Sequence, residues 1–90
     1  MADRLERIRA TLAELEAELR QLDSLDETTR EALADATADI ADTLRHGKRS
    51  AKTRIAESSL RDRLADFEAS HPQLAGVLTR LLDGLAQLGI

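Results

Sequence analysis

The chain has 90 residues, no cysteine, one aromatic residue and a net charge of −4 at pH 7. This length allows one small domain, and the absence of cysteine excludes a disulfide framework and a thiol nucleophile. The modest negative charge argues against a protein whose whole surface binds nucleic acid.

The apolar residues are mostly leucine and alanine, with few β-branched residues, one proline and four glycines. Leucine packed on leucine and alanine favours contacts between helices, whereas a sheet would need more β-branched and aromatic side chains. We therefore predict an all-α fold in a single domain over residues 1–90. It would be a helical hairpin followed by a bent C-terminal helix pair, in a four-helix bundle or coiled-coil-like assembly.

The first predicted helix, about residues 3–22, carries a large apolar residue at every third or fourth position. This spacing is that of a coiled-coil seam, which another helix must cover. The seam residues are Leu5, Ile8, Leu12, Leu15, Leu19 and Leu22. We expect the seam to pair with a second copy of the chain in a homo-oligomer. The alternative is that it packs on the last helix of its own chain.

Charges beside this seam indicate the direction of such a pairing. In a parallel pair Arg4 would face Arg9 of the second copy, and the contact would be repulsive. In an antiparallel pair Arg4 would face Glu18 instead, and Arg9 would face Asp23. Exposed ion pairs contribute only about 0–1 kcal/mol each, so they select the antiparallel direction without supplying much stability.

The second predicted helix covers about residues 27–45 and follows a turn that Asp26, or Ser24 with Glu27, can cap. Its apolar face is thin, because many of the neighbouring positions are alanine, which favours a helix but buries little area. The face consists of Leu33, Thr37, Ile40 and Leu44. Gly47 suits the left-handed backbone position that follows a helix end.

Residues 47–58 interrupt the apolar pattern, and we predict a basic linker there. Residues 45–54 have a net charge of +5, against −7 for residues 1–44. The cations are Arg45, Lys48, Arg49, Lys52 and Arg54, which are candidate anion-binding residues. No aromatic side chain lies among them to stack on a base, which disfavours nucleic acid and leaves an anionic protein or membrane surface, or a solvated linker.

Two further helices are predicted at about residues 60–69 and 72–88. Ser59 and Ser70 are candidate N-caps for them, and Pro72 fits the first turn of the last helix. The last helix has the widest apolar face, so we expect it at the centre of the fold. Its large residues are Leu74, Val77, Leu78, Leu81, Leu82, Leu85 and Leu88.

No motif in the chain predicts catalysis, a cofactor or a metal site. His46 and His71 are far apart in sequence and have no clustered partner at the spacing of metal ligands. Four serines have no recognisable general base, namely Ser50, Ser58, Ser59 and Ser70. We therefore expect a protein that is not an enzyme and that binds neither cofactor nor metal.

The expected function is a helical protein–protein interaction module or a self-associating scaffold. The alternative is a nucleic-acid or anionic-surface binder that acts through residues 45–54. The first residues lead into a charged helix, and no apolar stretch approaches the roughly 18 residues that would span a bilayer, so a cytoplasmic protein is expected.

The most specific sequence pattern is the run Phe67-Glu68-Ala69-Ser70-His71-Pro72 together with the Gly89-Ile90 terminus. With the leucine-rich first helix and the turn at residues 25–30, it resembles the bacterial family of short proteins called domain of unknown function 4404. The resemblance covers most of the chain. It implies an all-helical protein that is bacterial and cytoplasmic, with no assigned activity, and it transfers no catalytic residue. It also implies a structural corner at Phe67, Ser70, His71 and Pro72.

Overall fold

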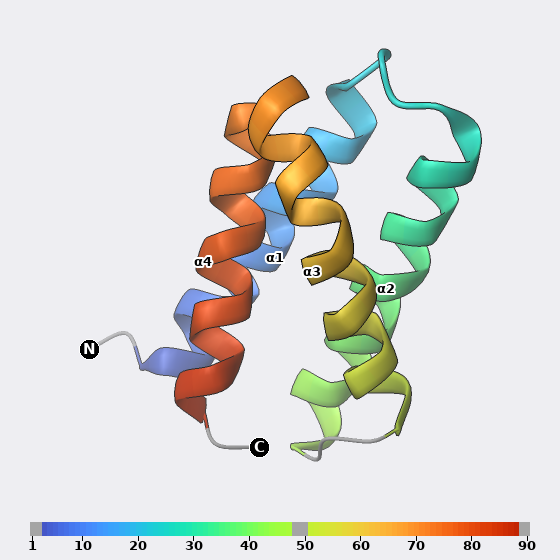
Figure 1. Cartoon of the computed structure of the whole chain (residues 1–90). Coiled ribbons are helices and arrows are strands. Elements are labelled where there is room, and N and C mark those ends of the chain that lie inside the picture. Colours follow the sequence, from blue (N-terminus) through green and yellow to red (C-terminus); the bar gives the residue numbers. More distant parts are fainter. Residues whose placement is uncertain (1–2, 48–50, 89–90) are drawn as a thin grey trace.

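The computed structural model describes residues 3–47 and 51–88, and these residues form helices and turns without any strand (Figure 1). The helices are α1 (Arg4–Gln21), α2 (Glu27–His46), α3 (Ala51–Ser70) and α4 (Pro72–Leu88). The predicted all-α fold is confirmed, and the predicted bounds of α1, α2 and α4 agree with the structure to within a residue or so.

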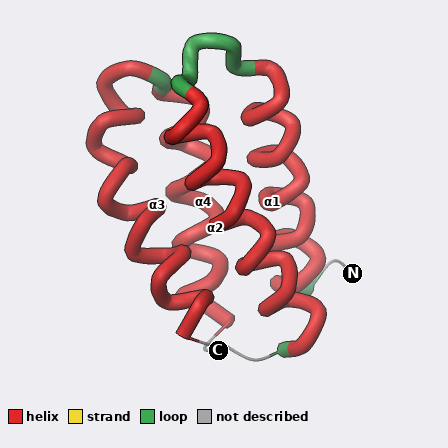
Figure 2. Tube along the Cα trace, turned by 90° about the vertical axis from the view of Figure 1, so that its right-hand side faces the viewer, coloured by secondary structure: helices red, strands yellow, loops and turns green. Residues whose placement is uncertain are grey.

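Successive helices run in opposite directions, so the described chain is an up-down-up-down bundle (Figures 1 and 2). α1 packs against α2 and α4, and α3 packs against the same two helices. α2 and α4 therefore occupy opposite corners of the bundle. This topology follows from the short connections, which can join only antiparallel neighbours.

α4 supplies more large buried side chains than any other described helix, as its wide apolar face predicted. They are Leu74, Val77, Leu78, Leu81, Leu82 and Leu85. α1 contributes four such residues, α2 contributes three, and α3 contributes Leu60 and Phe67. Because burial of each large side chain gains about 1.5–3 kcal/mol, α4 is the main source of hydrophobic stabilisation.

The seam of α1 lies inside this core. Ile8, Leu12, Leu15 and Leu19 are buried, and Leu5 and Leu22 are partly buried against the same cluster. The structure therefore corrects the expectation that a second copy is needed to cover the seam, because α4 and α2 of the same chain cover it. The spacing of the leucines could not separate the two cases, since both require the same apolar surface.

The largest difference from the sequence prediction is the start of α3, which begins at Ala51 instead of near Leu60. The predicted linker is therefore wrong over residues 51–58, while residues 48–50 lie outside the described residues. Thr53 and Ala56 are buried and continue the helical spacing that leads to Leu60. Because these side chains are small or polar, a pattern based on large apolar residues places the start of the helix too late.

The ends of the helices show which of the predicted caps form. Asp26 caps α2, because its Oδ1 accepts a hydrogen bond of 2.8 Å from the backbone N–H of Thr29. Hydrogen bonds from the side chain and the backbone of Thr29 lower the pKa of Asp26. Gly47 ends α2 with a φ of 68°, as predicted. Ser59 and Ser70 do not cap helices, since both lie within α3.

The guanidinium group of Arg30 ties the start of α2 to the end of α1. It donates hydrogen bonds to the carbonyl oxygens of Leu19 and Leu22, which lie at the end of a helix where carbonyls have no partner in the helix itself. Arg30 is thus a C-terminal cap for α1 that is provided by the next helix.

Candidate functional site

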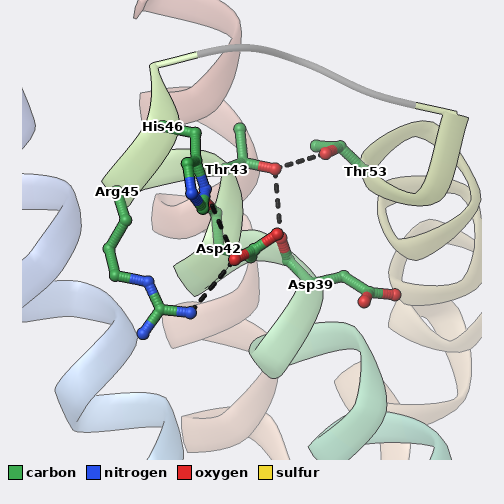
Figure 3. A network of polar contacts seen from close by, with 6 residues as sticks. All are labelled: Asp39, Asp42, Thr43, Arg45, His46 and Thr53. Carbon is green, nitrogen blue, oxygen red and sulfur yellow. Dashed lines mark hydrogen bonds and ion pairs between the residues drawn. The ribbon is translucent and has the colours of Figure 1, made fainter.

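The predicted anion-binding segment is partly neutralised by an acid of its own helix. At the end of α2, Arg45 Nη2 lies 3.1 Å from Asp42 Oδ1, and His46 Nδ1 lies 3.4 Å from the same oxygen (Figure 3). The hydrogen bond from Arg45 lowers the pKa of Asp42, and the charges of His46 and Lys52 act in the same direction. Asp42 therefore stays ionised and offsets the cations around it.

The two other described cations of this segment, Lys52 and Arg54, do not share one surface. Lys52 and Arg54 are both exposed on α3, but residues two positions apart on a helix point to roughly opposite sides. Lys48 and Arg49 lie outside the described residues. The structure thus brings Arg45 and Lys52 toward Asp42 and separates Arg54 from them.

A polar contact holds α2 and α3 together beside this end of the bundle. The hydroxyl of Thr43 donates to the carbonyl oxygen of Asp39, at 3.0 Å, and is also hydrogen-bonded to the hydroxyl of Thr53 (Figure 3). Both threonines are buried. The α2–α3 contact therefore includes a buried hydrogen bond. The polar contacts between α1 and α4, from Arg80 to Glu14 and from Arg4 to the carbonyl oxygen of Gln87, lie at the exposed surface, outside a leucine-rich interface.

A groove of about 380 Å³ runs between α1 and α2 on the outside of the bundle. Its floor is apolar, and it is formed by Leu19 of α1 together with Ala34, Ala38 and Ala41 of α2. Glu16 and Arg20 of α1 stand at the edge. The groove stays open because alanine side chains end at Cβ and cannot fill the space between the two helices.

The outer side of α2 carries an acidic stripe, formed by Glu27, Glu31, Asp35 and Asp39 at intervals of four residues. Like charges at this spacing are neighbours on the helix surface and destabilise it by about 0.2–0.5 kcal/mol per pair. No cation in residues 3–47 or 51–88 forms an ion pair with any of the four. Within the described residues, the stripe therefore presents four carboxylates without an ion-pair partner, and Lys52 lies near two of them, Asp35 and Asp39.

A second groove, of about 310 Å³, lies on the other side of α2, against α3. It is lined by Asp35, Ala38, Asp39, Lys52 and Ile55. Ile55 is 69% exposed and is the one large hydrophobic residue exposed in the described part of the chain. Because Ala38 lines both grooves, they adjoin. We call the surface made of the two grooves and the acidic stripe the α2 face.

The sequence alone does not predict the α2 face as a site, because its alanines favour a helix but bury little area. The signal that could have identified it is the acid at every fourth position, with alanines beside the acids. Repulsion between these acids destabilises an isolated helix, and a cationic partner would relieve it.

In the described ranges, 3–47 and 51–88, no three His, Asp or Glu residues gather closely enough to hold a metal ion.

Comparison with known proteins identifies a family but no characterised relative. The model of the family described as Domain of unknown function (DUF4404) matches residues 8–90. No curated protein and no solved structure matches the chain. Among the helices that the structure describes, none combines the length and the apolar character needed to cross a membrane.

Proposed function

This chain belongs to the family described as domain of unknown function 4404, and we propose that it is a helical interaction module whose α2 face binds a cationic amphipathic helix of another protein. The observation that carries the proposal is the apolar α1–α2 groove lying directly beside the acidic stripe, whose carboxylates form no ion pair with a cation of residues 3–47 or 51–88. The groove would hold apolar side chains of the partner, and the stripe would select its charge.

A helix suits this groove for geometric reasons. Amphipathic helices bind grooves between two helices by inserting residues from successive turns. The floor of Ala34, Ala38 and Ala41 extends over two turns of α2, so it can accept two or three such side chains. Cations beside those anchors would lie over Glu31 and Asp35, which compensates the acidic stripe and raises the rate of association.

The outside of α2 supports the proposal better than the seam of α1 does. Assembly of a homo-oligomer through the seam would require α1 to leave both α2 and α4, with exposure of Ile8, Leu12, Leu15 and Leu19. The α2 face is accessible without any such opening. The alternative of an anionic partner bound through residues 45–54 has less support, because Asp42 offsets Arg45, and Lys52 and Arg54 diverge.

A synthetic helical peptide of leucine and lysine, about 18 residues long, provides a direct test. We expect saturable binding in fluorescence anisotropy, with an affinity that falls as salt is raised. A peptide in which glutamate replaces lysine has the same apolar face and should not bind. Equal binding of the two peptides would show that the acidic stripe does not select the partner.

A pair of matched variants locates the binding surface. Ala38→Lys places a cation in both grooves and should weaken binding of the leucine–lysine peptide by about tenfold, which is roughly 1.4 kcal/mol. Ala65→Lys makes the same change at an exposed position of α3 that lines neither groove, and should leave the affinity unchanged. Equal affinities of the two variants would place the peptide elsewhere and refute the proposal.

A further inference from the structure

The turn between α1 and α2 and the turn between α3 and α4 are joined by a hydrogen bond between Ser24 and His71. Ser24 Oγ lies 2.8 Å from His71 Nε2, although the two residues are 47 positions apart in sequence. Both turns lie at the same end of the bundle (Figure 1). Both side chains are accessible, since Ser24 is exposed and His71 is half-buried.

The neighbouring hydrogen bonds fix the direction of this one. Ser70 Oγ donates to the carbonyl oxygen of Asp66 at 2.9 Å, so its lone pairs remain available for His71 Nδ1 at 3.0 Å. Nδ1 of a neutral imidazole must then carry the proton and donate it, which leaves the lone pair on Nε2. The hydroxyl of Ser24 therefore donates its proton to His71 Nε2.

We propose that Ser24 is a nucleophile, with His71 as its general base, and that it accepts an acyl group from an activated ester. A serine hydroxyl is activated when it is hydrogen-bonded to a base and a third group holds that base in orientation. In the reaction, Ser24 Oγ forms a bond to the carbonyl carbon and its proton moves to His71 Nε2. The bond from that carbon to the leaving oxygen then breaks, and the leaving group departs with the electron pair.

Space for the acyl group lies next to the imidazole. A pocket of about 330 Å³ has a mixed lining of the apolar residues Leu22, Pro72 and Leu74 and the polar residues Glu18, His71 and Gln73. Ser24 does not line this pocket itself and reaches it through its hydrogen bond to His71. The pocket lies at the start of α4, where the backbone N–H groups of Gln73 and Leu74 have no acceptor within the helix. Such N–H groups stabilise the negative oxygen that develops on the carbonyl during acyl transfer.

Each residue has a distinct part in this reaction. Ser24 and His71 are the catalytic residues, because they exchange the proton and form the bond. Ser70 is a positioning residue that holds the ring through Nδ1. The sequence alone predicts Ser24 only as a helix cap, because Ser24 and His71 meet only through the packing of two turns. The site shares no residue with the α2 face, so it stands independently of the proposed function.

The full-length chain can be tested with p-nitrophenyl acetate. We expect the wild-type chain to release nitrophenolate about 10²-fold faster than the Ser24→Ala variant does, which is within the usual range for general-base catalysis. Trypsin separates the relevant residues, because Ser24 lies in the peptide of residues 21–30 and His71 in that of residues 64–80. Mass spectrometry of the wild-type chain should find the acetyl group on the first peptide, at Ser24.

Four variants separate catalysis from a purely structural role. His71→Asn should remove the reaction while circular dichroism still shows a folded helical protein. Ser70→Ala should slow the reaction, and Ser70→Thr should restore it, since threonine keeps the hydroxyl. His46→Asn alters a histidine outside the site and should change nothing. An acetyl group found on the peptide of residues 64–80, or an unchanged rate in Ser24→Ala, would refute the proposal.

Discussion

α4 and α2 occupy opposite corners of the bundle and are held there by different interactions. α4 buries six large apolar residues, whereas α2 buries only Leu33, Ile40 and Leu44. α2 instead relies on polar contacts, namely the Asp26 cap, the bonds from Arg30 to α1 and the bond from Thr43 to Thr53. A helix with a thin apolar face can thus be fixed by hydrogen bonds, which leaves its outer side open for a partner.

The largest effect is expected from loss of a leucine in α4. Leu81 is completely buried, so Leu81→Ala removes its contacts and leaves a cavity. The free energy of unfolding should fall by about 2–5 kcal/mol. Urea denaturation followed by circular dichroism measures this change. Leu64→Ala, at a partly buried position of α3, should cost clearly less. Equal losses would contradict the conclusion that α4 is the main source of hydrophobic stabilisation.

The next effect tests the polar anchoring of α2. Arg30→Met removes two hydrogen bonds from a charged donor to the end of α1, and should lower the free energy of unfolding by about 1.5–3 kcal/mol. Arg30→Lys should recover only part of this loss, because an ammonium group lacks the two-pronged geometry of guanidinium. Arg20→Met changes an exposed arginine and should leave urea denaturation nearly unaltered. A full recovery with lysine would refute the two-carbonyl cap.

Two glycines lie on different sides of α4: Gly84 faces α1, and Gly76 faces solvent. A Cβ at Gly84 would lie 2.8 Å from Cγ1 of Ile8, whereas a Cβ at Gly76 would meet no atom within 4 Å. Gly76→Ala should therefore raise the free energy of unfolding by about 0.5–1 kcal/mol through helix propensity. Gly84→Ala should lower it by about 1 kcal/mol, since crowding exceeds that gain. Thermal denaturation of both variants should show opposite signs.

The smallest effect concerns the exposed cap of α2. Hydrogen bonds from Thr29 lower the pKa of Asp26 below its ordinary value of 3.8. Stability from this carboxylate is therefore present above that value and is lost as the pH falls through the lower pKa of the folded chain. Asp26→Asn keeps a capping oxygen that does not titrate, so its Tm should approach that of the wild type as the pH falls toward 2. A constant Tm difference would contradict this account.

The sequence predicted most of the local structure of the bundle. Asp26, Gly47 and Pro72 occupy the cap and first-turn positions that their chemistry favours, because these preferences depend only on a few neighbouring residues. The start of α3 was predicted wrongly, since Thr53 and Ala56 are buried there without being large or apolar enough to mark the helix. Of the three predicted anion-binding residues that the structure describes, Arg45 and Lys52 approach a common acid, Asp42, and Arg54 does not.

The amino-acid sequence alone determined that this protein is helical, where three of its helices lie and that the last one has the widest apolar face. The expected central position of that helix is wrong, because it occupies a corner of the bundle and, among the described helices, contacts only α1 and α3. Helix propensity, capping and the spacing of leucines act over one or two turns and can be recognised residue by residue. The tertiary structure decided that the seam of α1 is covered within the chain, that α2 presents an open acidic face and that Ser24 meets His71. These features depend on contacts between residues distant in sequence, and local pattern carries no information on which distant surfaces will meet.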